Sequence, residues 1–157
     1  MVNPEAQRVV AALGLERLPH EGGFFRATWR SAAGSAIYFL LTADDFSALH
    51  RLRTDEVWHF YAGDAVEHVQ LGSSAGSTPV RHTRLGPNVI VGDTPQLVVP
   101  AGLWQGARLA TPVRSGWALL GCTLAPPWDE SQFELGARDA LLRTFPEHAT
   151  IVQALTR

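Results

Sequence analysis

The sequence is poor in cysteine and lacks any long apolar segment. A single cysteine, Cys122, among 157 residues excludes an internal disulfide framework and zinc sites built from several cysteines. Because Cys122 lies in the apolar run 118–124, we expect it to be a small buried residue. No apolar run approaches the roughly 20 residues of a membrane helix, and residues 1–13 mix polar with apolar side chains, unlike a signal peptide. These absences favour a cytoplasmic protein.

The sequence also has no large excess of either positive or negative charge. The formal net charge is -2, the pI is about 6.3, and no block of like charges occurs. A nucleic-acid-binding domain normally carries a basic stripe, and an anionic membrane surface attracts basic clusters. We therefore expect no nucleic-acid partner and no membrane partner; the partner expected from the interior cavity predicted below is a small-molecule ligand.

The length and the two ends of the chain indicate one domain that begins and ends with helices. A fraction of 46% hydrophobic and 18% charged residues is ordinary for a globular protein, and the length suits a single domain, 1–157. Asn3 followed by proline is typical of a helix start, and Gly14 of its end. Apolar residues at helical spacing predict two further helices over 137–145 and 147–155.

Between these helices the sequence has the character of an all-β structure. Short segments rich in β-branched and aromatic residues alternate with Gly, Pro, Asn and Asp. The predicted strands are Gly23–Arg30, Ser35–Leu41, Ser47–Leu52, Val57–Ala62, Ala65–Leu71, Val80–Arg84, Gln96–Val99, Gly106–Leu109 and Trp117–Leu124. A flexible turn is expected over Gly72–Pro79. Short strands without long helices between them indicate a sandwich or barrel, with its core at roughly 20–126 and a tail at roughly 129–157.

Strand alternation predicts a cluster of polar side chains inside this barrel. Residues two apart in a strand share a face. His50 therefore lies on one face of its strand, and Glu56, Trp58 and Phe60 lie on one face of the next. If both faces point inward, His50 and Glu56 meet in an aromatic cavity, and a slip of one residue would reverse this.

Two short motifs in this region resemble those of the cupin superfamily. The first superfamily motif is a His-x-His pair, a Glu a few residues later and a Gly seven residues after the Glu; His50, Glu56 and Gly63 match this spacing. The second is Pro-x-Gly, two residues and a His. The run 100–105 matches it with Gln105 in place of the His.

Further blocks resemble one branch, the fifth cupin family, long labelled a domain of unknown function. They are Glu21–Arg26, Ala36–Leu41, Glu56–Asp64, Val99–Gln105, and Gly121–Thr123 with Phe133–Leu135. The resemblance implies an all-β fold, a small antiparallel cupin (jelly-roll) barrel with short N-terminal and C-terminal helices. It also implies a homodimer, which would cover the long edge strands of such a barrel. Function does not follow from the fold.

The metal ligands that the resemblance implies are incomplete. A metal-loaded cupin typically offers three His and one Glu, but Leu52 and Gln105 replace two of these histidines. Leucine cannot bind a metal, and a glutamine oxygen is a poor ligand for borderline divalent ions. We therefore favour a site without a cofactor. If a divalent metal is bound, His50, Glu56 and Gln105 are its ligands.

A metal-free set of His50, Glu56 and Gln105 is suited to proton transfer. Desolvation raises the pKa of a buried carboxyl group, and an adjacent histidine opposes this. Glu56 and His50 are thus the candidate catalytic acid and base, and Gln105 would orient a carbonyl group. This favours an isomerase or epimerase acting on a polar, sugar-like or carboxylated metabolite. The alternatives are a metal-dependent oxygenase and a non-catalytic metabolite-binding or sensing module.

Other polar residues are assigned by their context. Glu21 and Arg26 flank a Gly-Gly pair and are expected at the mouth of the cavity, where Arg26 would hold an anionic group. The alternative is a turn whose charges pair on the surface. His68, His82 and His148 lie in polar or loop contexts, and we expect them at the surface.

Overall fold

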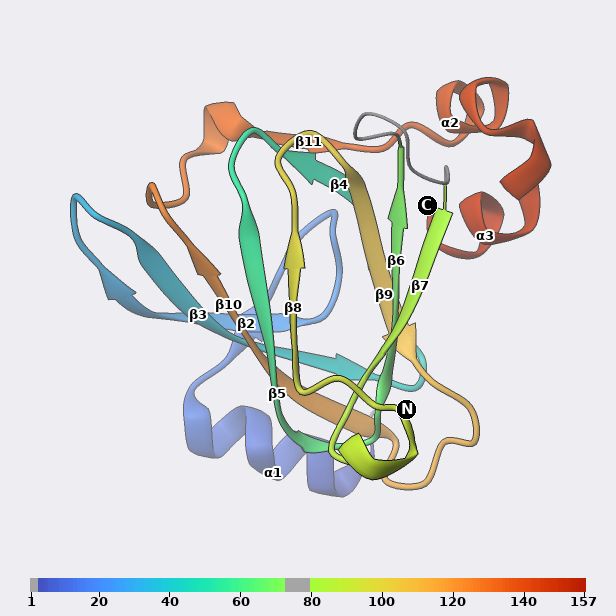
Figure 1. Ribbon diagram of the computed structural model, residues 1–157. Helices are drawn as coiled ribbons and strands as arrows, with labels where there is room; N and C mark the ends of the chain where they lie inside the picture. The colour runs from blue at the N-terminus through green and yellow to red at the C-terminus, as the bar shows by residue number, and fades with distance from the viewer. Residues whose placement is uncertain (1–2, 73–79) are drawn as a thin grey trace.

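Two antiparallel β-sheets face each other in the computed structural model, which describes residues 3–72 and 80–157 (Figure 1). The six-stranded sheet has the order β1-β2-β3-β10-β5-β8, and the five-stranded sheet has the order β11-β4-β9-β6-β7. The strands are β1 (Glu16–Arg17), β2 (Phe24–Arg30), β3 (Ser35–Thr42), β4 (Ser47–Leu52), β5 (Glu56–Gly63), β6 (Val66–Leu71), β7 (Val80–Leu85), β8 (Gln96–Val99), β9 (Trp104–Leu109), β10 (Trp117–Leu124) and β11 (Phe133–Leu135).

The strand order confirms the predicted jelly-roll. Strand β10 lies between β3 and β5, and β9 lies between β4 and β6, so neighbours in space are distant in sequence. Every pairing of the named strands is antiparallel. The two sheets are layers of one jelly-roll and are not hydrogen-bonded into a closed cylinder.

The predicted strands agree closely with the observed ones. The bounds of β4, β8 and β10 are as predicted, and the others differ by at most two residues. Strands β1 and β11 were not predicted, because two or three residues are too few for a visible alternation. Of the turn predicted over Gly72–Pro79, residues 73–79 lie outside the described residues.

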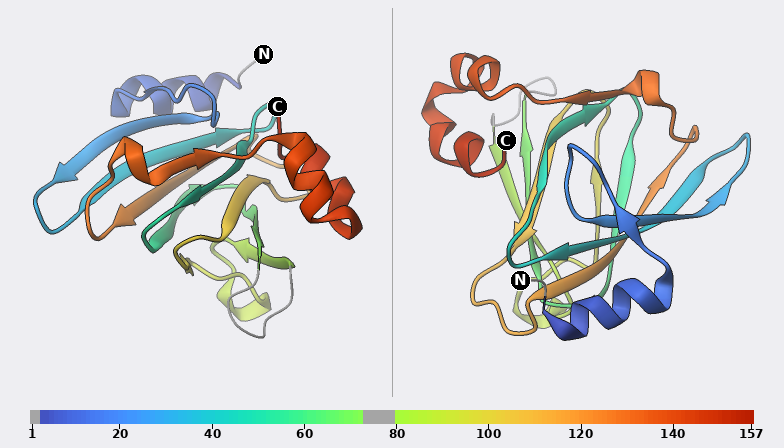
Figure 2. Two further views of the ribbon diagram at one scale, coloured as in Figure 1. Left: turned by 90° about the horizontal axis from the view of Figure 1, so that it is seen from above. Right: turned by 180° about the vertical axis from the view of Figure 1, so that it is seen from behind.

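The helices cover the outer faces of the sheets (Figure 2). Helix α1 (Pro4–Leu13) begins at Asn3, whose side chain accepts a hydrogen bond from the Glu5 amide, and ends at Gly14 with φ 60°. Helix α1 packs on the six-stranded sheet around Leu40 and Trp117. The tail forms α2 (Arg138–Thr144), a 3-10 turn (Pro146–His148) and α3 (Ala149–Ala154), which pack on the five-stranded sheet around Leu49 and Val69. Among residues 3–72 and 80–157, no helix has the length and apolar character needed to cross a bilayer.

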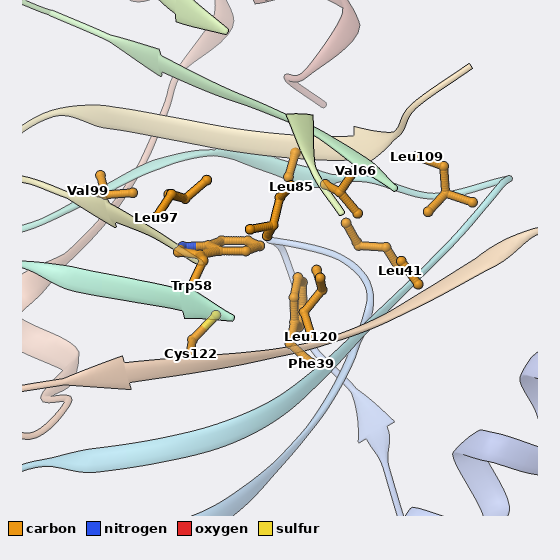
Figure 3. Packing of buried hydrophobic residues seen from close by; sticks show 12 residues of the cluster. Phe39, Leu41, Trp58, Val66, Leu85, Leu97, Val99, Leu109, Leu120 and Cys122 are labelled. Atoms are coloured by element: carbon orange, nitrogen blue, oxygen red, sulfur yellow. The ribbon is translucent and has the colours of Figure 1, made fainter. Parts of the chain in front are cut away.

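The space between the sheets is filled at one end by a tightly packed apolar core (Figure 3). Leu41, Val66, Leu85 and Leu120 are fully buried there. Trp58 belongs to this cluster, near Leu97 and Val99, and its indole nitrogen points away from Leu41 and Val66. One end of the jelly-roll is therefore filled by apolar side chains.

Candidate functional site

A cavity of about 420 Å³ lies between the sheets at the end opposite the packed core. Antiparallel register brings Ser35, Glu56 and Leu124 together here, because β3 and β5 begin where β10 ends. The large apolar side chains that line the cavity are Leu18, Phe25, Trp29, Ile37, Phe39, Leu52, Trp58, Leu124, Trp128 and Phe133. The polar residues that line it are His20, Glu21, Arg30, Ser35, His50, Glu56, Cys122 and Glu130. A concave, mainly apolar site with a few convergent polar groups is typical of a small-molecule site.

His50 is held in one orientation by its backbone and by an aromatic ring. Its Nδ1 lies 2.8 Å from the carbonyl oxygen of Ala48, and a carbonyl can only accept, so Nδ1 carries the hydrogen. The ring stacks on Phe133 with centroids 5.4 Å apart. His50 is only 3% exposed and lines the cavity. In the neutral ring, Nε2 then keeps a lone pair that faces a molecule in the cavity.

The carboxyl group of Glu56 accepts hydrogen bonds from two uncharged side chains, Gln105 and Trp58. Gln105 Nε2 donates to Glu56 Oε2 at 2.7 Å and joins the two sheets. Trp58 Nε1 lies 3.2 Å from the same Oε2 and 2.9 Å from Gln105 Oε1, so it is shared between two acceptors. Because Oε2 accepts both bonds, a proton on Glu56 belongs on Oε1.

Burial controls the protonation of the groups around Glu56. Desolvation raises the pKa of Glu56, the nearby His50 opposes the rise, and the Glu21 carboxyl group adds to it. Behind Gln105, burial lowers the pKa of His68 to about 3, so His68 is neutral at physiological pH. Burial also raises the pKa of the Cys122 thiol well above its usual value, which makes it a poor nucleophile.

Glu21 reaches the cavity from a tight loop between β1 and β2. Gly22 and Gly23 have φ of 103° and 75°, and a Cβ at Gly22 would collide with the Phe46 carbonyl oxygen, so glycine is required at this position. Ser47 Oγ donates to Glu21 Oε1 at 2.8 Å. The same oxygen lies 3.9 Å from His50 Nδ1. The loop thus places a second carboxyl group beside His50.

The structure brings His50, Glu56, Glu21 and Trp58 to one cavity, with Gln105 directly behind Glu56. Arg26 was misplaced by the sequence reasoning. It points to the outer face of β2, with its guanidinium 5.4 Å from the ring centre of Tyr38, while Phe25 and Ala27 face inward.

Two further placements differ from expectation. Phe60 is half-buried against the apolar core and does not line the cavity. His68 was expected at the surface, but it is fully buried, with Nε2 3.4 Å from Gln105 Oε1. Alternation with the buried Val66 was the available signal, since both residues lie on one face of β6.

His82 is exposed as expected and pairs with Glu67. His148 is half-buried.

The side chains at this site do not suit the metal shell of a three-His, one-Glu cupin. Both ends of the Gln105 amide are already used, the NH2 group by Glu56 and the oxygen by Trp58 and His68. Leu52 presents an apolar side chain where a ligand would be needed. Within residues 3–72 and 80–157, no three His, Cys, Asp or Glu residues are grouped so as to bind an ion.

This architecture, a jelly-roll with a cavity at one end of its two sheets, is that of a cupin. Residues 7–136 match the family model described as Cupin superfamily (DUF985), which covers most of the chain. The protein therefore belongs to this cupin family.

Solved structures agree with this assignment. A hypothetical protein from Leishmania major is 27% identical, with coverage of 96% of this chain and 98% of that one and a TM-score of 0.90. A protein from Shewanella oneidensis is 34% identical, with coverage of 100% and 99% and a TM-score of 0.87. Oxalate decarboxylase from Bacillus subtilis, 12% identical, shares only the fold: coverage is 90% and 37%, with a TM-score of 0.57. No curated protein shows significant similarity to the chain.

Proposed function

We propose that the cavity binds a small carbonyl compound and that Glu56 and His50 move a proton beside its carbonyl group, as in an isomerase. The observation that supports this most directly is the pairing of a buried Glu56, held through Oε2, with a His50 whose Nδ1 is already occupied. One group is arranged to donate a proton and the other to accept one.

The proton-transfer step balances with these two groups alone. His50 Nε2 takes the proton from the carbon next to the carbonyl, while Glu56 Oε1 gives its proton to the carbonyl oxygen. The products are an enol, an imidazolium at His50 and a carboxylate at Glu56. Return of a proton to carbon from His50, with recovery of the oxygen proton by Glu56, regenerates both groups. Positioned acid–base groups of this kind accelerate reactions by about 10²–10⁴-fold.

The surrounding residues support the acid role of Glu56. An apolar site that keeps a carboxylic acid neutral allows it to donate a hydrogen bond to a carbonyl oxygen. The raised pKa of Glu56 and the aromatic walls formed by Phe39 and Trp58 fit this pattern. The chain contains no lysine, so activation of the carbonyl as a Schiff base with lysine is excluded for it.

Hydrogen exchange tests the proposal. We expect the protein to catalyse incorporation of deuterium from D2O next to the carbonyl group of 1-tetralone, followed by proton NMR. Glu56→Gln retains size and an oxygen to accept from Gln105 and Trp58, so exchange should fall at least about 10²-fold with little change in the melting temperature. Glu16→Gln makes the same chemical change on the exposed β1 and is the matched control.

Either of two results would contradict the proposal. Exchange that persists unchanged in Glu56→Gln would remove Glu56 from the mechanism. A ligand that binds the wild-type protein but acquires no deuterium would favour the second candidate, a non-catalytic binding module, for which the cavity itself is the supporting observation.

A further inference from the structure

The cavity has an aromatic outer part and a polar inner end. Trp29 and Trp128 are 49% and 43% exposed and line the cavity where it approaches solvent. Glu56 and His50 are 6% and 3% exposed and lie at the inner end. A molecule that fills the cavity must therefore place an apolar body against aromatic rings and a polar tip against Glu56 and His50.

No arginine or lysine lies at the inner end of the cavity, as the described residues 3–72 and 80–157 form it, to pair with an acidic ligand. Two carboxyl groups, those of Glu21 and Glu56, face it. Arg30 is the sole arginine among the described residues that lines the cavity, and its Nη1 donates to the carbonyl oxygen of Trp128 at 2.8 Å, next to the outer aromatic part. The chain has no lysine that could supply another positive charge. A carboxylate or phosphate at the inner end would face the Glu21 carboxyl group with no arginine or lysine beside it, and burying an unpaired charge is costly.

The inner end is also arranged for a neutral tip and not for a cationic one. Glu56 Oε2 already accepts hydrogen bonds from Gln105 and Trp58, and Glu21 Oε1 accepts one from Ser47. These donors satisfy one oxygen of each carboxyl group without any positive charge. An ammonium group would have to leave water for an apolar site in which the raised pKa of Glu56 favours a neutral carboxyl group as its neighbour, and burying a poorly paired charge is costly.

We propose that the ligand is an uncharged compound with a fused-ring or aromatic body and a single carbonyl tip, and that the cavity rejects carboxylates of the same shape. This inference rests on the proposed function and specifies its substrate class. It replaces the sugar-like or carboxylated metabolite expected from the sequence, because Arg26 lies outside the cavity and the walls are mainly apolar.

Matched probes test the charge preference independently of catalysis. Binding of 2-naphthamide, 2-naphthoate and 2-naphthylmethylamine to the full chain would be measured by titration calorimetry at about pH 7. We expect the amide to bind about tenfold or more tightly than either charged probe. In Glu21→Gln the carboxylate should recover at least about threefold relative to the amide, because one of the two facing carboxyl groups is gone. In Glu16→Gln, an equal charge change outside the cavity, the ratio should stay as in the wild type.

Tighter or equal binding of the carboxylate or of the amine would overturn the inference and leave the proposed proton transfer untouched. Failure of all three probes to bind would also overturn this ligand class. Deuterium exchange into 1-tetralone, measured with Glu56→Gln, decides the proposed function separately. An unchanged probe ratio in Glu21→Gln would contradict the role given to Glu21.

Discussion

The two ends of the same jelly-roll differ in how they use buried space. At one end Leu41, Val66, Leu85 and Leu120 fill the gap between the sheets completely. At the other end the sheets enclose a cavity of about 420 Å³ whose inner groups are polar and buried. The packed end gains free energy from apolar contacts, whereas the cavity end forgoes contacts and desolvates His50 and Glu56. The densely packed apolar side chains and the polar groups of the cavity thus lie at different ends of one jelly-roll.

The largest effect is expected when a leucine is replaced by alanine at the packed end, and the same replacement at the cavity end provides the comparison. Leu85→Ala should lower the free energy of unfolding by about 2–5 kcal/mol, because it leaves a void in a closed core. Leu52→Ala should cost clearly less, because its side chain already borders the cavity and has fewer contacts to lose. Urea unfolding measures both changes. Equal losses at the two positions would show that the cavity end is as tightly packed as the core.

A smaller effect is expected from pH, through the buried His68 beside Gln105. The pKa of His68 is about 3 in the folded protein against an ordinary 6.5, since burial disfavours its charged form. Below pH 6.5 the unfolded chain binds a proton at this histidine that the folded chain does not. Stability therefore falls as the pH drops from 6.5 toward 3, by about 2 kcal/mol at pH 5.

His68→Gln isolates this contribution. The variant keeps a donor for Gln105 Oε1 but does not titrate, so its unfolding free energy should decline less between pH 7 and pH 5 than that of the wild type. Glu56 acts in the opposite sense: its raised pKa contributes stability that is lost as the pH rises above its ordinary value. Because Glu56 is present in both proteins, the difference between their profiles reports His68 alone. Parallel profiles would contradict the neutral state of His68.

The smallest effect on stability is expected at the outer part of the cavity. Trp29 is half-exposed, so Trp29→Ala should change the unfolding free energy by about 1 kcal/mol or less. The affinity of the Trp29→Ala variant for 2-naphthamide should nevertheless fall, because an aromatic wall of the cavity is removed. Tyr61→Ala removes an equally exposed ring from the outer sheet face and should leave the affinity unchanged. Equal affinities for the amide in both variants would place the ligand elsewhere.

The fold could be predicted from the sequence because its strands are marked by local patterns. Alternation and turn residues define β4, β8 and β10 to the residue, and the spacing of His50, Glu56 and Gly63 indicates the jelly-roll. Such signals depend on neighbours in the chain, which a sequence shows directly.

The details of the site depend on contacts that the sequence does not show. His68 appeared polar and exposed because its burial results from the pairing of β6 with β9, and its partner Gln105 is 37 residues away. Arg26 was misplaced because its reach was judged from the Gly-Gly pair, whereas alternation along β2 turns it outward and Phe25 inward. Phe133 was quoted only as part of the family resemblance, because a three-residue strand leaves no periodic trace.

The position of β10 has a consequence for how the chain folds. This strand joins β3 to β5, and the cavity walls draw on residues from Leu18 to Phe133. Until residues 117–124 are available, β3 and β5 have no neighbour between them and their backbone groups form open edges. Pairings so distant in sequence require a large loss of chain entropy before they return stabilising contacts, which slows folding. A chain growing on the ribosome therefore has no ligand site until nearly all of the domain has been synthesised.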